Sequence, residues 1–155
     1  MDVVALGELL IDFVQTGITD QGAPIMAANS GGAPINYLGA LARYGRSCGM
    51  IGKVGADAFG ALLLRTLAAH KIAYLGGQTD RAFTTLAFVS LDARGERSFS
   101  FARKPGADTL LRADEIPYDQ IKSARAFHFG TLSLTDEPAK SATFAAVRCA
   151  LENGV

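Results

Sequence analysis

Short apolar runs alternate with longer amphipathic stretches along most of the chain. The first run, at residues 3–6, is closed by Gly7, and similar strand-like runs lie at residues 47–54, 72–75 and 125–130. Helical spacing of apolar residues covers residues 34–44, the stretch after Asp57, and residues 138–153. Because strands alternate with helices, we expect an α/β fold with a mostly parallel sheet and right-handed crossovers.

Three segments depart from this alternation. Residues 9–14 form an apolar run that is interrupted only by Asp12, which places an acid in an otherwise apolar strand. Residues 84–91 and 97–103 are strand-like runs joined by a short polar segment, so they predict an antiparallel hairpin added to the sheet. Residues 16–33 are rich in Gly, Ala, Pro and Asn without periodicity and predict an irregular loop.

Composition narrows the class of ligand. Of the 155 residues, 49% are hydrophobic, and 15 basic residues balance 15 acidic ones without a Lys/Arg run. The sequence therefore predicts one globular domain with a small-molecule ligand, without a surface for nucleic acid or an anionic membrane. The amino terminus lacks a signal-peptide pattern, which predicts a cytoplasmic protein. Cys48 and Cys149 stand alone and are expected to be buried and reduced.

The strongest local motif is a double glycine that opens a helix. Glycine lets the backbone approach a ligand closely, and the unpaired amides of a first helical turn bind oxygen atoms. A tight turn without any ligand remains an equally good interpretation of the motif alone. The motif is neither of the common nucleotide-phosphate loops. It reads Ser30-Gly31-Gly32-Ala33-Pro34-Ile35-Asn36.

Three motifs in order resemble the amino-terminal signature of the ribokinase family, also called pfkB-type kinases. These motifs are Gly7 to Phe13, the double-glycine motif, and Ile51 to Gly60; Gly95 to Phe101 and Phe127 to Gly130 resemble the fructokinase branch in particular. The resemblance spans essentially the whole chain. It implies a ribokinase-like fold, a mostly parallel sheet flanked by helices, with a small β lid at about residues 8–33 and 84–104.

The resemblance also implies roles for individual residues. Asp12 matches an acid that accepts hydrogen bonds from sugar hydroxyls, Gly31 and Gly32 match backbone that lies against the sugar, and Asn36 matches an amide that contacts it. Phe101 and Arg103 match lid positions that cover the sugar, although related families often have tyrosine where this chain has Phe101 or Ala102.

Each of these residues also has a structural interpretation. Asp12 could pair within the protein, Asn36 could cap the helix, Phe101 could pack in a lid or interface, and Arg103 could be a solvated strand-end charge. For five others the structural interpretation is favoured: Glu8 as a loop acid, Asp57 as a helix N-cap, Asp108 as a turn acid, His70 at the surface and His128 in the core.

The function implied by the resemblance is ATP-dependent phosphorylation of D-fructose to fructose 6-phosphate. ATP and Mg²⁺ would be the cofactors, a small-molecule sugar the partner, and a homodimer through the lid strands is possible. A kinase for another sugar, such as 2-keto-3-deoxygluconate or a nucleoside, and a non-catalytic sugar-binding or interaction module are the alternatives. The family's Gly-Ala-Gly-Asp motif with its catalytic base does not occur in the 155 residues. We therefore expect residues 1–155 to be the sugar-binding half of a kinase domain, inactive and incomplete alone.

Overall fold

The computed structural model describes residues 1–91 and 96–155. Its centre is a parallel sheet with the strand order β10-β1-β4-β6, which we call the core sheet. The strands are β1 (Val3–Leu6), β4 (Cys48–Ile51), β6 (Ala73–Tyr74) and β10 (Ala126–Phe129). The expected mostly parallel α/β sheet is confirmed.

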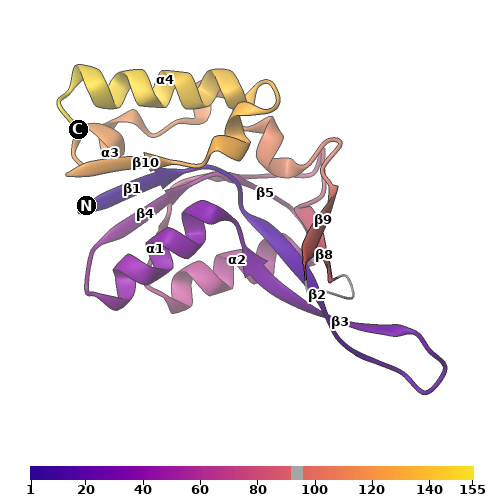
Figure 1. Ribbon diagram of the computed structural model, residues 1–155. Coiled ribbons are helices and arrows are strands. Elements are labelled where there is room, and N and C mark those ends of the chain that lie inside the picture. The colour runs from indigo at the N-terminus through magenta and orange to yellow at the C-terminus, as the bar shows by residue number, and fades with distance from the viewer. Residues whose placement is uncertain (92–95) are drawn as a thin grey trace.

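Helices cover both faces of the core sheet (Figure 1). Helices α1 (Ala33–Arg43) and α2 (Ala58–Ala69) lie on one face, and α3 (Tyr118–Lys122) and α4 (Ala139–Glu152) lie on the other. Alternate residues of β1 point into two separate cores: Val3 and Ala5 into the first, Val4 and Leu6 into the second. This period of two is what a sheet covered on both faces requires.

A second sheet, with the order β3-β2-β8-β9, stands beside the core sheet, and we call it the outer sheet. Strand β2 pairs antiparallel with β3 and parallel with β8, and β8 pairs antiparallel with β9. The joining segment 92–95 of the predicted hairpin lies outside the described residues. The four strands are β2 (Leu10–Ile18), β3 (Pro24–Gly31), β8 (Thr85–Leu91) and β9 (Arg97–Ala102).

Two expected elements are corrected by the structure. The predicted loop at residues 16–33 is wrong, because most of it belongs to the long hairpin of β2 and β3; its residues are small and polar because much of the hairpin is exposed on both faces. The single strand predicted at residues 47–54 breaks at Gly52. Its second part, β5 (Lys53–Gly55), pairs with β7 (Gly77–Thr79), a strand that the sequence did not predict.

The predicted cap of α2 is confirmed and also ties the helix to the outer sheet. Asp57 Oδ1 accepts hydrogen bonds from the backbone N–H groups of Phe59 and Gly60, at 2.9 and 2.8 Å. The same carboxylate accepts from the backbone N–H of Thr84, at 2.7 Å, just before β8 begins. One aspartate thus caps a helix and anchors a strand of the other sheet.

Two short 3₁₀ turns follow β9 of the outer sheet, and a third follows β10 of the core sheet. They are η1 (Ala107–Leu110), η2 (Ala113–Glu115) and η3 (Thr131–Leu134). Helix α4 packs on these turns with small residues such as Ala142 and Ala146, both fully buried. Its large apolar residues Phe144 and Leu151 are instead 50% and 73% exposed. Both cysteines are buried and free, as expected.

Candidate functional site

Asp12 and Phe101 project from the same face of the outer sheet. Asp12 pairs with Ala87, and Ala87 pairs with Phe101, so the three residues form one row across β2, β8 and β9. Neighbouring residues alternate, and Phe13 points to the opposite face, where its ring packs edge-on against Phe59 of α2, 5.5 Å between centroids. The row with Asp12 therefore faces away from α2.

The carboxylate of Asp12 has no hydrogen-bond partner within residues 1–91 and 96–155, although the side chain is half-buried. Burial raises the pKa of Asp12 above the ordinary aspartate value. Its Oδ2 lies close to where a Cβ of residue 31 would stand, so a side chain at residue 31 would displace the carboxylate from this position. A carboxylate partly stripped of water and without a protein donor is an acceptor that a ligand hydroxyl can satisfy.

The double glycine forms the turn that carries the chain from β3 into α1. Gly32 has φ of 115°, a conformation that L-residues rarely adopt, and it is the N-cap of α1. The backbone N–H of Asn36 donates to the Gly32 carbonyl at 3.2 Å, which places the Asn36 amide one turn into the helix. The side-chain amide of Asn36 is exposed and makes no hydrogen bond with the residues described. The suggestion that this side chain caps α1 is therefore wrong.

Phe101 is 49% exposed, and its ring stacks on that of Phe99 with 6.2 Å between centroids. The face of the outer sheet that carries Asp12 therefore ends in two partly exposed aromatic rings on its edge strand. An exposed ring of this kind can cover the apolar face of a ligand or pack against another protein.

Arg103 is not the solvated charge that one interpretation of the sequence suggested. Its side chain is 8% exposed and follows the end of β9. The Nε atom donates to Asp108 Oδ2 at 2.9 Å, and the two terminal nitrogens donate to Leu132 O, Thr135 Oγ1 and Asp136 Oδ2. All the guanidinium nitrogens are thus held by protein acceptors, which ties the end of β9 to η1 and η3.

Two acids that the sequence analysis treated as loop and turn residues are buried. Asp108 is 5% exposed and pairs with Arg103, and Thr85 Oγ1 donates to its Oδ1. Glu8 is 4% exposed and accepts the backbone N–H of Ala33 at 2.9 Å. The only sequence signal for their burial is that each stands beside apolar residues, Glu8 before Leu9-Leu10-Ile11 and Asp108 before Leu110-Leu111.

The two histidines differ in their surroundings. His70 is exposed, as expected, and its Nδ1 lies 2.8 Å from Thr66 O. His128 is only half-buried on β10, where its ring packs against Tyr37 with 4.4 Å between centroids. The expected core position of His128 is therefore only partly correct.

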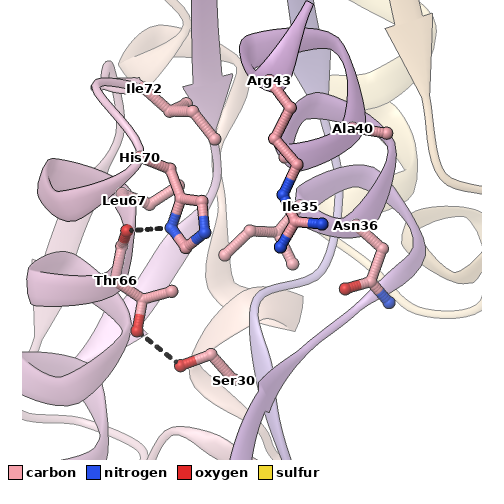
Figure 2. Close-up of a pocket in the computed structure, with 10 residues that line it drawn as sticks. Ser30, Ile35, Asn36, Ala40, Arg43, Thr66, Leu67, His70 and Ile72 are labelled. Carbon is pink, nitrogen blue, oxygen red and sulfur yellow. Dashed lines mark hydrogen bonds between the residues drawn. The ribbon is translucent and has the colours of Figure 1, made fainter.

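A cavity of about 330 Å³ lies between α1 and α2 (Figure 2). Ser30 Oγ and Thr66 Oγ1 are 2.8 Å apart at one wall, and Ile35 and Leu67 supply apolar lining. Asn36 borders this cavity as well as the double-glycine turn. The cavity and Asp12 are separated because Ser30 lies in the row of Ile11, which alternates with the row of Asp12.

Within residues 1–91 and 96–155, no three His, Cys, Asp or Glu side chains gather closely enough to hold a metal ion. No described helix is long and apolar enough to cross a membrane.

The core sheet with helices on both faces, joined to a separate outer sheet with a half-buried carboxylate beside a double-glycine turn, defines a ribokinase-like α/β fold. A fructokinase structure from Xylella fastidiosa superposes with a TM-score of 0.91 at 35% identity, covering 99% of this chain and 50% of that chain. A second Xylella fastidiosa fructokinase structure, with bound ATP, superposes with a TM-score of 0.90 at 34% identity and covers 98% of this chain and 49% of that chain.

The chain belongs to the pfkB family of carbohydrate kinases, whose model matches residues 1–155. Among curated relatives, "Probable fructokinase-6, chloroplastic" of Arabidopsis thaliana is 46% identical over 99% of this chain and 41% of its own length. The fructokinase of Solanum tuberosum is 44% identical over 98% of this chain and 49% of its own length. The chain thus spans about half the length of the curated relatives it matches.

Proposed function

We propose that this chain supplies the sugar-binding part of an ATP-dependent fructokinase. The observation that carries the proposal is the half-buried Asp12 carboxylate, which lies against Gly31 and has no donor among the described residues. Such an acceptor beside the double-glycine turn, which leads into the helix that carries the exposed Asn36 amide, suits an array of sugar hydroxyls. The relatives named as fructokinases supply the choice of sugar and of ATP as phosphoryl donor.

In this proposal the residues of the chain bind and orient the sugar. Asp12 accepts hydrogen bonds from sugar hydroxyls, and the backbone of Gly31 and Gly32 lies against the sugar ring. The side-chain amide of Asn36 donates and accepts hydrogen bonds at the edge of the ring. The outer sheet, at about residues 8–33 and 84–104, forms a lid over the sugar, and Phe101 covers the apolar face of the sugar. Phosphoryl transfer depends on positioning the acceptor hydroxyl, on removing its proton and on neutralising phosphate charge. We assign only the first task to this chain and place the base in the half that its relatives have in addition.

The state of Arg103 favours a neutral sugar over a keto-sugar acid. A free cation would bind the carboxylate of a keto-sugar acid strongly, whereas the Arg103 guanidinium already donates to Asp108, Asp136, Thr135 and Leu132. The direct sugar contact of Arg103 stays a prediction, and so does the cytoplasmic location, since one relative carries the name chloroplastic. A substrate panel in which 2-keto-3-deoxygluconate exceeds fructose in kcat/KM would overturn the choice of sugar.

The test is kinetic, in a full-length kinase that joins this chain to the carboxy-terminal half of a fructokinase relative. Asp12→Asn and Asn36→Ala should each raise the KM for fructose by about 10- to 100-fold, the effect expected from losing hydrogen bonds made to or by a polar ligand. The KM for ATP should change by less than about twofold. Asp20→Asn, at an exposed turn of the β2–β3 hairpin, is the matched control. A defect confined to ATP would contradict the assignment.

The outer sheet also supports a proposal for assembly. Phe99 and Phe101 are about half exposed on its edge strand, at 52% and 49%, and Ile25 of β3 is 48% exposed. Partly exposed apolar residues on a sheet with an open edge are typical of a surface that pairs with another copy. We therefore propose a homodimer through the strands of the outer sheet, tested below.

A further inference from the structure

The chain crosses between the core sheet and the outer sheet at several places, among them the following three. It leaves β1 for β2 through Gly7 to Leu9, returns from β3 into α1 through Gly31 and Gly32, and leaves β9 for η1 through residues 103–106. Glu8 lies in the first crossing, and its side chain reaches the second, where Oε1 accepts the Ala33 N–H at 2.9 Å. Glu8 therefore joins the first two of these crossings.

The packing around Glu8 leaves almost no free space. A Cβ added at Gly32 would stand 2.6 Å from the Glu8 carbonyl oxygen, and one at Gly130 would stand 2.6 Å from Glu8 Oε2. Gly130 follows β10, so the carboxyl group also touches the carboxyl-terminal end of the core sheet. Glu8 is 4% exposed, and its backbone and side chain together hold three segments that are far apart in sequence.

One carboxyl oxygen of Glu8 is left without a partner. Oε2 is buried and makes no hydrogen bond within the part of the chain that the structure describes. Burial raises the pKa of Glu8; of the charged groups that face it, Asp108 raises the pKa further and Arg103 lowers it. Because Arg103 is already bound to Asp108 and Asp136, Glu8 has no counter-charge of its own. A buried acid in this state costs stability.

We propose that Glu8 is a positioning residue of the sugar site: by bonding Ala33 and filling the space between Gly32 and Gly130, it holds the double-glycine turn against Asp12. The sugar part of this inference rests on the proposed function. The geometric part does not, because it concerns the place of the Asp12 carboxylate relative to Gly31 in the free protein. The Glu8 side chain acts by its shape and by the oxygen that accepts the Ala33 N–H. Glutamine in its place should therefore keep the positioning role, whereas aspartate, which is one methylene shorter, should lose it.

The experiment compares Glu8→Gln, Glu8→Asp and Glu8→Ala in the 155-residue chain, with Glu152→Ala at an exposed position of α4 as the matched control. Nuclear magnetic resonance follows the titration of the Asp12 carboxyl group and the amide signals of Gly31 and Gly32. In the Ala and Asp variants the turn should loosen, which rehydrates Asp12 and moves its pKa down toward the ordinary value of 3.8. In the Gln and control variants the Asp12 titration should stay where it is in the unmodified chain.

Fructose binding is measured on the same samples. Glu8→Ala should weaken it by about tenfold, the effect of one lost hydrogen-bonded contact, and Glu8→Gln by less than about twofold. If the unmodified chain does not bind fructose, the proposed function loses support, while the Asp12 titration still decides the role of Glu8. If Glu8→Ala does not fold, the contrast between Gln and Asp decides it. An unchanged Asp12 titration in Glu8→Asp, or equal damage by Gln and Asp, overturns the proposal.

Discussion

The core sheet and the outer sheet differ in what their side chains are used for. In β1 and β4 every residue is buried and pairs with a parallel neighbour, so these strands are committed to packing. In the outer sheet, Phe13 of β2 packs on Phe59 of α2, while the other face carries an unpartnered carboxylate and exposed aromatic rings. On this face of the outer sheet, the carboxylate and the rings are groups that a ligand or a partner can satisfy.

The largest expected difference between the sheets is in stability. Ile51 of β4 is 0% exposed and Ile25 of β3 is 48% exposed. Ile51→Ala should lower the free energy of unfolding by about 2–5 kcal/mol because it leaves a cavity in the second core. Ile25→Ala should lower it by less than about 1 kcal/mol, since half of the side chain is already in water. Urea denaturation of both variants measures the contrast; equal losses would mean that the outer sheet is as tightly packed as the core.

A second difference concerns two aspartates that the fold treats in opposite ways. Burial disfavours the charge of Asp57, but hydrogen bonds from Thr84, Gly60 and Phe59 outweigh it and lower its pKa. Burial alone raises the pKa of Asp12. Asp57→Ala should therefore cost about 2 kcal/mol at neutral pH, through the lost cap and strand anchor. Asp12→Asn should raise stability slightly at neutral pH, because the variant has no charge to bury.

The stability contributions of Asp57 and Asp12 change with pH in opposite directions. The stabilisation from Asp57 is complete above the unfolded pKa near 3.8 and is lost as pH falls below it through the lowered folded pKa. The contribution of Asp12 is complete below 3.8 and is lost as pH rises through its raised folded pKa. Unfolding curves are recorded from pH 3 to pH 7 in steps of about half a pH unit. Comparing the unmodified chain with Asp57→Asn and with Asp12→Asn gives the contribution of each carboxylate. Parallel pH dependence would contradict the environments described above.

The smallest expected effect is on self-association, and it compares the exposed apolar side chains of the outer sheet with those of α4. Replacing Phe99 and Phe101 together by serine should weaken association by about tenfold, since two half-exposed rings leave the proposed dimer surface. Replacing Phe144 and Leu151 of α4 is the matched control, because these side chains are also 50% and 73% exposed. Sedimentation equilibrium measures both. If only the α4 pair reduces association, α4 and not the outer sheet forms the contact.

Part of the candidate site could be predicted from local sequence. The apolar run around Asp12 and the double glycine before Pro34 predict a buried acid and a tight turn into a helix, and the structure contains both. The burial of Glu8 and the complete pairing of Arg103 could not be predicted in this way. Both depend on residues more than twenty positions away, Ala33 for Glu8 and Leu132 for Arg103.

The sequence by itself determined the alternation of strands and helices, the cap at Asp57 and membership of the pfkB family, because these depend on periodicity and on short motifs. Only the tertiary structure decided that residues 16–31 belong to a long hairpin and that β4 and β5 enter different sheets. It also decided that Asp12 shares a row with Phe101. Strand pairing joins residues distant in sequence, and on a surface hairpin with few core contacts the apolar period that would reveal a strand is absent.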